Sequence, residues 1–250
     1  MTIRQTIFAL TAAAALASCG NKETTVATLQ QLPQTDYAAS LIANNIASMP
    51  KGYKISVGVA NDTVGKPAEG FSLLRKGKKI SIIGNDAAGA IYGTNRLMEY
   101  FKQNNSLEIP YTIIDAPEMK LRGACVGLQK TVYLPGHKVY EYPYTPENFP
   151  WFYDKELWIK YLDMLAADNM NAVFLWNGHP FASLVKLKDY PFAPEVDDAT
   201  MKKNQEMFSF LTTEAQKRGI RIIQMFYNII VSKPFADHYG IKTQDRNRPI

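Results

Sequence analysis

The sequence predicts an α/β protein in which a small α/β domain precedes the opening strands of a (β/α)8 barrel. Before residue 117 the pattern reads helix, strand, strand, helix, and beyond it apolar strands alternate with amphipathic helices. Such alternation is typical of a parallel sheet, and right-handed crossovers curl that sheet into a barrel. The 250 residues are 46% hydrophobic and 20% charged, which excludes a disordered chain, a collagen-like chain and a polytopic membrane protein.

Residues 1–18 have the pattern of an export signal. Arg4 precedes an apolar run from Ile7 to Ala17, which is too short to span a bilayer. The run ends in Leu16, Ala17, Ser18 and Cys19, which resembles the lipobox of bacterial lipoproteins. We therefore expect Cys19 to be lipidated and the chain to be exported and anchored in the cell envelope, periplasmic or on the outer surface. A soluble secreted protein cleaved elsewhere and a buried N-terminal helix are the alternatives.

The net charge bears on the binding partners, and the cysteine content bears on disulfide bonds. The formal net charge of +5 is small and dispersed along the chain, which argues against nucleic acid as a partner. The densest basic run, residues 75–79, lies between two predicted strands and indicates a glycine-centred hairpin turn with solvated lysines. With Cys19 acylated, Cys125 has no disulfide partner, and its apolar surroundings predict a small core residue.

After a linker over residues 19–34, residues 35–117 are expected to form the first domain. Apolar residues between Ala38 and Ile46 lie on one helical face, and Asp86 is placed to cap a second helix. The predicted strands of this domain are Lys54–Val59, Phe71–Leu74 and Lys79–Ile83. The run Gly84 to Gly89 lacks the closely spaced glycine pair of a dinucleotide site and has no Lys-Ser or Lys-Thr after it, so we expect no nucleotide cofactor there.

Residues 118–250 are expected to start the barrel. Its predicted strands are Leu121–Leu128, Asn171–Trp176 and Arg221–Tyr227. The first predicted helix covers Lys155–Asn169; the second is capped by Asp197 or Asp198 and ends at Gly219.

Several of these residues resemble a known family. The run from Gly84 to Gly93, the segment Ile114 to Pro117 and the pair Arg122 and Gly123 are similar to the accessory domain of glycoside hydrolase family 20 hexosaminidases. The same kind of domain precedes the barrel in family 67 α-glucuronidases. The resemblance implies that Arg122 and Gly123 open a catalytic barrel, and it implies an enzyme that hydrolyses O-glycosidic bonds in a polysaccharide or other glycan.

Candidate substrate-binding residues follow from position, because residues at the carboxyl ends of barrel strands face the substrate. By position they are Trp176, Asn177, His179 and Asn228, and the family resemblance adds Arg122 at the first strand. For Arg122, contact with sugar hydroxyls is what the family resemblance implies; an ion pair inside the barrel is the alternative. The loop over residues 129–153 holds eight aromatic residues, which serve either as platforms for sugar rings or as a small core of the loop itself.

The catalytic residues cannot be placed on these 250 residues. In the resembled families the carboxylate pair lies on the fourth strand or later, so we expect it beyond residue 250 and expect this chain to be inactive alone. His137, His179 and His238 fall in successive loops, but without short ligand spacing they predict no metal site. No cofactor is expected. A surface glycan-binding lipoprotein without hydrolytic activity, or a purely structural envelope lipoprotein, are the alternative functions.

Overall fold

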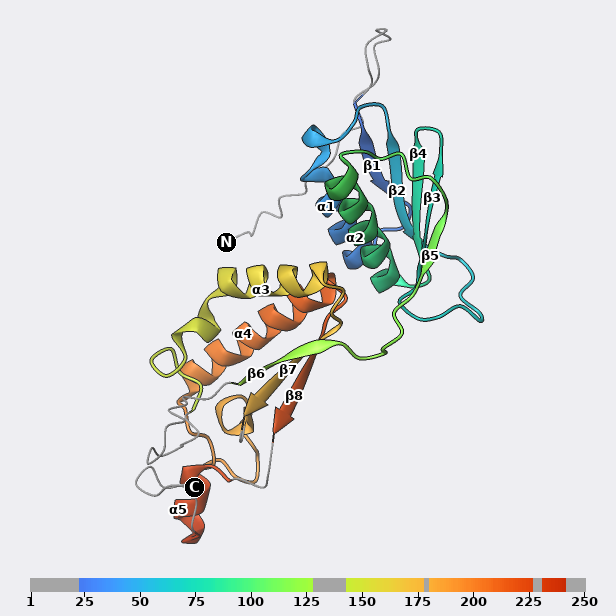
Figure 1. Ribbon diagram of the computed structural model, residues 1–250. Coiled ribbons are helices and arrows are strands. Elements are labelled where there is room, and N and C mark those ends of the chain that lie inside the picture. Colours follow the sequence, from blue (N-terminus) through green and yellow to red (C-terminus); the bar gives the residue numbers. More distant parts are fainter. Residues whose placement is uncertain (1–22, 128–142, 178–179, 227–230, 242–250) are drawn as a thin grey trace, which may run out of the picture.

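The computed structural model describes residues 23–127, 143–177, 180–226 and 231–241. Within these residues there are two separate sheets (Figure 1). The first has five strands in the order β1-β2-β4-β3-β5, and the second has three strands in the order β6-β7-β8. The predicted arrangement, a small α/β domain followed by the first strands of a parallel barrel, is confirmed.

The first domain is a mixed sheet covered on one face by two helices. Its strands are β1 (Thr25–Thr28), β2 (Lys54–Val59), β3 (Phe71–Lys76), β4 (Lys79–Gly84) and β5 (Ile113–Asp115). Its helices are α1 (Pro33–Ala43) and α2 (Ala87–Asn104), with a short 3-10 turn at Ile46–Ser48. Strands β1, β2 and β4 run parallel, whereas β3 is antiparallel to β4 and β5. Both helices bury their apolar residues against the sheet.

The domain begins earlier than the sequence indicated, because part of the predicted linker is a strand. Residues Thr25–Thr28 pair with β2, and α1 starts at Pro33. The preceding Thr24 fixes the start of β1, since its hydroxyl donates to Pro50 O at 2.6 Å and accepts from the Tyr53 amide at 3.1 Å. A four-residue edge strand with alternating exposed and half-buried residues gives too little apolar pattern to be recognised.

The glycine run at the start of α2 has a packing role. A Cβ on Gly84 would lie 2.2 Å from Ala90 N, and a Cβ on Gly89 would lie 2.1 Å from Gly70 O. At Gly93, the added atom would lie 2.7 Å from a side-chain carbon of Ile82. These distances are far below van der Waals contact, so the glycines let the helix lie directly against the sheet.

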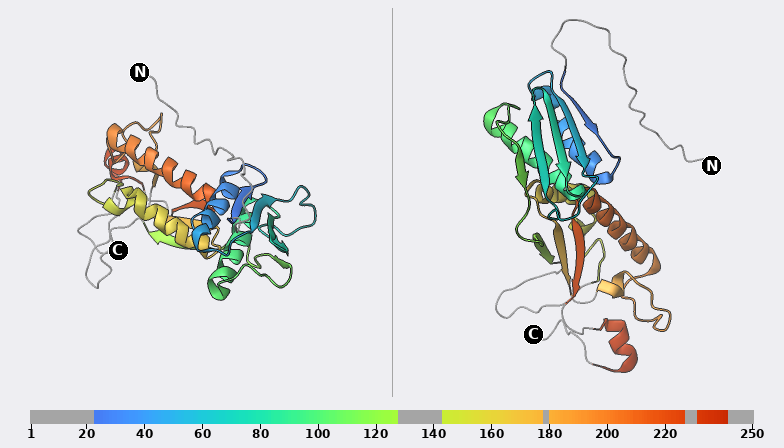
Figure 2. Two further views of the ribbon diagram at one scale, coloured as in Figure 1. Left: turned by 90° about the horizontal axis from the view of Figure 1, so that it is seen from above. Right: turned by 90° about the vertical axis from the view of Figure 1, so that its right-hand side faces the viewer.

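The second domain has three parallel strands, β6 (Gly123–Gly127), β7 (Ala172–Asn177) and β8 (Arg221–Phe226). Its two long helices are α3 (Lys155–Ala167) and α4 (Asp198–Lys217), and its short elements are α5 (Lys233–Tyr239) and 3-10 turns at Pro150–Tyr153 and Pro180–Ser183. Helices α3 and α4 lie on the same face of this sheet (Figure 2), and their apolar residues pack against it. Consecutive neighbouring strands with helices on one face are the arrangement of a barrel rather than of a doubly wound sheet.

Aspartates start the three long helices that follow β4, β6 and β7. Asp86 accepts from the Gly89 amide, Asp154 from the Leu157 amide and Asp197 from the Thr200 amide. Each satisfies a backbone N–H that has no partner inside its helix. Of the two cap candidates for α4, Asp197 is therefore the cap. No helix in the described ranges combines the length and the apolar character needed to cross a membrane.

The glycine packing makes a testable prediction. Gly89→Ala places a methyl group against a backbone carbonyl, and such overpacking costs about 1–3 kcal/mol of unfolding free energy. Gly127→Ala is the matched control, because a Cβ there meets nothing within 4 Å. Urea unfolding followed by circular dichroism measures both variants. Equal stability of the two variants would contradict the packing role.

Candidate functional site

The carboxyl ends of β6, β7 and β8 lie at one edge of the second domain, on the side facing away from the first domain (Figure 1). The face of this sheet opposite α3 and α4 has no covering element among the described residues. Substrate sites of parallel α/β barrels lie at this edge, since the loops that follow the strands meet there. We therefore take these strand ends and their loops as the candidate site.

Trp176 lies at the strand ends as the sequence predicts. In the strand register it lies between Gly127 of β6 and Met225 of β8. Trp176 is 38% exposed, and the neighbouring Gly127 has no side chain to cover it. A partly exposed indole beside a glycine offers an apolar platform on which the C–H face of a sugar ring can stack.

Cys125 lies on the same uncovered face of β6, where it is exposed, so the prediction that it is a core residue is wrong for the described chain. The reason is the strand alternation: its neighbours Ala124 and Val126 point toward the helices, and Cys125 points the other way.

A pocket of about 340 Å³ lies between two loops that follow these strands. Phe181 and Tyr190 come from the β7–α4 loop, and Phe235 comes from α5. The loops are joined by the Ser232 hydroxyl, which donates to Ala193 O at 2.7 Å, and by Glu195 Oε1, which accepts from the Lys233 amide at 2.9 Å. The pocket walls are thus held in place by hydrogen bonds, and the lining is mainly apolar and aromatic.

Sequence reasoning missed the role of Glu195, which precedes α4 by three residues and is therefore easily taken for part of its cap. Its contact is with a loop 38 residues further on, and only the tertiary structure reveals such a contact. No local pattern distinguishes it from a cap.

The described part of the aromatic loop forms a small core, which was one of the two alternatives. Phe149 and Phe152 are buried against Tyr144, and Trp158 of α3 donates its indole N–H to Phe152 O at 2.8 Å. Tyr153 donates to Asn204 of α4. These rings therefore fasten the loop to the helices rather than facing the strand ends. Tyr133, Tyr140 and Tyr142 lie outside the described residues.

The remaining predicted site residues cannot be placed. His179, Asn228 and His137 lie outside the described residues, as does the side chain of Asn177. His238 is described, and its ring stacks on Phe192 with a centroid distance of 3.7 Å. Among the described residues, no three His, Cys, Asp or Glu side chains are grouped to hold a metal ion.

At the opposite ends of these strands, Glu69 of the first domain reaches the start of each strand. Its carboxylate accepts from Asn171 Nδ2 at 2.9 and 3.1 Å, directly before β7. It pairs with Arg122 at 2.7 Å, directly before β6, and lies 3.7 Å from Arg221 Nη2 at the start of β8. Glu69 and the side chain of Arg122 are largely buried, and Asn171 is wholly buried.

Arg122 therefore lies at this junction. Its ion pair with Glu69 corresponds to the alternative that the sequence left open, except that the pair joins the two domains rather than lying inside the barrel. Its Nε donates to Asn169 O, Nη1 to Met119 O, and Nη2 to both Glu69 and Tyr92 Oη. Every guanidinium nitrogen is thus engaged by the protein. Arg122 precedes β6, so its side chain lies at the amino end of the strand, far from the loops that follow it. Burial and the nearby Glu69 raise the pKa of Tyr92 to about 12, so its phenol is neutral at pH 7.

A second group of contacts joins the domains at Tyr37 of α1. Arg218, which is buried after α4, donates from Nε to Asp163 Oδ1 at 2.7 Å and from Nη1 to Glu214 Oε2 at 2.8 Å. Tyr37 of α1 donates to the same Asp163 oxygen at 2.9 Å and lies under the guanidinium. Burial first, and then the Asp163 charge, raise the pKa of Tyr37. Asp163 and Glu214 are thus engaged at the junction rather than at the strand ends.

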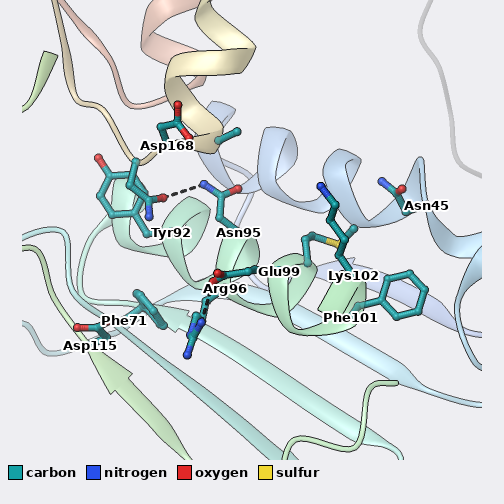
Figure 3. A pocket seen from close by; sticks show the side chains of 13 residues that line it. Asn45, Phe71, Tyr92, Asn95, Arg96, Glu99, Phe101, Lys102, Asp115 and Asp168 are labelled. Atoms are coloured by element: carbon teal, nitrogen blue, oxygen red, sulfur yellow. Dashed lines mark hydrogen bonds and ion pairs between the residues drawn. The ribbon is translucent and has the colours of Figure 1, made fainter. Parts of the chain in front are cut away.

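A larger hollow of about 750 Å³ runs along α2 on the junction side (Figure 3). Asn95 of α2 donates there to Asn169 Oδ1 at 2.8 Å, and Arg96 pairs with Glu99 at 2.7 Å. The hollow also touches Asp168 at the end of α3. Because it lies at the amino ends of the barrel strands, it is separate from the strand-end site.

The described chain is thus an α/β domain fixed to the amino ends of the first strands of a barrel, with aromatic residues at the opposite ends of those strands. Residues 1–115 match the family model described as glycosyl hydrolase family 20, domain 2. The resemblance inferred from the glycine run and the Asp-x-Pro segment is confirmed. The comparison with curated proteins gave no match.

Among solved structures, the chain is similar to a glycoside hydrolase family 138 enzyme targeting pectin rhamnogalacturonan II. The two are 58% identical with a TM-score of 0.82, and the match covers 91% of this chain and 27% of that enzyme. This chain thus spans about a quarter of that enzyme's length. A family 20 β-N-acetylglucosaminidase (TM-score 0.53, 14% identity, 91% of this chain and 44% of that one) shares the fold. So does the chitobiase of Flavobacterium johnsoniae (TM-score 0.52, 14% identity, 88% of this chain and 33% of that one).

The exposed indole gives the second prediction. Trp176→Ala is expected to weaken binding of an oligosaccharide ligand about 3- to 10-fold, because a stacked aromatic ring contributes about 0.5–1.5 kcal/mol. Isothermal titration calorimetry measures the change. Trp176→Phe is the control, since it keeps a ring at the strand end and should retain most of the affinity. An unchanged affinity for Trp176→Ala would place the ligand elsewhere.

Proposed function

We propose that this chain is the N-terminal part of an exported, lipid-anchored glycoside hydrolase that cleaves O-glycosidic bonds in a pectic polysaccharide. The observation that carries the proposal is the 58% identity over 91% of the chain to an enzyme targeting pectin rhamnogalacturonan II. Identity at this level over both domains supports a shared substrate class more strongly than the fold alone does.

The geometry is consistent with a structural role for the first domain and a substrate-binding role for the second. The first domain is fixed to the amino ends of the strands through Glu69 and through Tyr37, which contacts Asp163 and Arg218, so the carboxyl ends remain open for substrate. Trp176 and the aromatic pocket supply stacking surfaces at that edge. Catalysis requires two carboxyl groups about 5 to 9.5 Å apart. In the resembled families this pair lies on the fourth strand or later, so it is expected beyond residue 250. Asp163 and Glu214 are engaged at the junction.

The anchor is the second part of the proposal. The sequence before Cys19 supports cleavage and acylation at that residue, which holds the enzyme at the cell envelope next to imported or surface-bound polysaccharide. Two or three acyl chains suffice for stable attachment, since each buried methylene contributes about 0.8 kcal/mol.

The direct test is hydrolysis by the product of the whole reading frame that contains this chain. We expect reducing sugar to be released from rhamnogalacturonan II and not from an N-acetylglucosaminide, because the identity to the family 20 structures is only 14%. The 250-residue chain alone is the control and should release none, because a complete barrel needs about 200 to 250 residues and only 133 follow Pro117.

Affinity gel electrophoresis distinguishes the enzyme from the alternative, a glycan-binding lipoprotein without activity. If the whole product is retarded by pectic polysaccharide and releases no sugar, the protein is a glycan-binding lipoprotein and the enzymatic proposal fails. If the reading frame stops at Ile250, the expected catalytic pair is missing, and the enzymatic proposal fails for that reason.

A further inference from the structure

A basic surface lies at one end of the first sheet. Strands β1, β2 and β4 begin at this end and β3 finishes there, so their terminal residues lie in one row. The register aligns Thr25 with Lys54, Lys54 with Lys79, and Lys79 with Lys76. We call this surface the lysine end; its exposed members are Lys51, Lys54, Lys76, Lys78 and Lys79.

Few acidic groups compensate this charge. Glu108 pairs with Arg75 at 2.6 Å and lies 3.8 Å from Lys78 Nζ. Within the described residues, the other four members of the lysine end form no ion pair. Like charges directly opposite each other on neighbouring strands destabilise a sheet. The row of lysines therefore lowers the stability of the sheet when no partner is bound. An anionic partner would relieve the repulsion between these charges.

The lysine end is also where the chain enters the domain. Thr24 is buried and fixed by its bonds to Pro50 and Tyr53, which places the start of β1 at this end. Cys19 precedes Thr24 by five residues, a segment that extends at most about 18 Å. The second domain lies at the other end of the sheet, with its strand ends pointing further away (Figures 1 and 2).

We propose that the lysine end docks on an anionic phospholipid surface and orients the anchored protein with its strand-end site facing away from the membrane. The inference rests on the proposed anchoring at Cys19, which confines the lysine end to within a short tether of the headgroups. Headgroup phosphates attract lysines at short range, and this attraction decays within a Debye length of about 8 Å.

The test uses the lipidated chain reconstituted into vesicles of phosphatidylcholine, with or without phosphatidylglycerol. Acetylation of lysine amines, read by mass spectrometry, reports which side chains the surface covers. We expect labelling of Lys54, Lys76 and Lys79 to fall at least several-fold on the anionic vesicles only, and to recover in high salt. Lys160, Lys188 and Lys202 of the second domain are internal controls and should label equally on both. Equal labelling of the lysine end on both vesicles would overturn the proposal.

A charge variant keeps the test independent of labelling. The triple change Lys54→Gln, Lys76→Gln and Lys79→Gln should lower the partition of non-lipidated chain onto anionic vesicles about 10- to 100-fold. The matched triple Lys160→Gln, Lys188→Gln and Lys202→Gln removes the same charge and should leave partition unchanged. All six residues are exposed, so both variants should fold as the parent does, which circular dichroism checks. An equal loss for both triples would mean that net charge alone acts, which refutes a docking face.

Failure of the anchor is distinguished from failure of docking. If Cys19→Ala leaves fatty-acid labelling of the expressed protein unchanged, the proposed anchoring is wrong, and the non-lipidated partition experiment still decides the lysine end. If polygalacturonate, added without vesicles, protects the lysine end while anionic vesicles do not, the surface binds acidic glycan and membrane docking is refuted.

Discussion

The structure depends on one buried carboxylate, that of Glu69. It contacts Arg122, Asn171 and Arg221, which lie at or directly before the starts of three neighbouring barrel strands. Glu69 holds this position with a left-handed backbone, φ 60°, which a residue with a Cβ adopts only where its surroundings enforce it. Asp86 enforces it, because one carboxylate oxygen accepts from the Glu69 amide while the other caps α2. The residue that caps α2 on the first sheet thereby also positions Glu69 at the amino ends of the strands of the second sheet.

Most of the fold could be predicted because local signals agreed with tertiary packing. The 3.6-residue apolar periodicity located α2, α3 and α4, aspartate caps marked the starts of α2 and α4, and the basic turn located the β3–β4 hairpin around Gly77. The two short edge strands, Thr25–Thr28 and Ile113–Asp115, were missed. Each is stabilised by pairing with a neighbouring strand rather than by its own apolar pattern, so a single sequence holds little trace of it.

Site residues could be predicted only where the position of a residue in a strand determines the face to which its side chain points. Trp176 follows from the alternation of β7, which fixes the face on which its ring lies. Arg122 could not be assigned in this way, because its partner Glu69 is 53 residues away and comes from a different domain. The same holds for Arg218, which reads locally as a helix C-terminal cation and in fact joins α1 to α3 and α4. Long-range ion pairs leave no periodic signature in a sequence.

The most direct test of the account is a double-mutant cycle on Glu69→Ala and Arg122→Ala, with unfolding free energies from urea titration. Each single change leaves one partner of a buried pair uncompensated, and we expect each to cost about 3–5 kcal/mol. The double variant should cost little more than either single one, with a coupling energy above about 1 kcal/mol. Additive effects of the two changes would contradict the claim that this ion pair joins the accessory domain to the barrel.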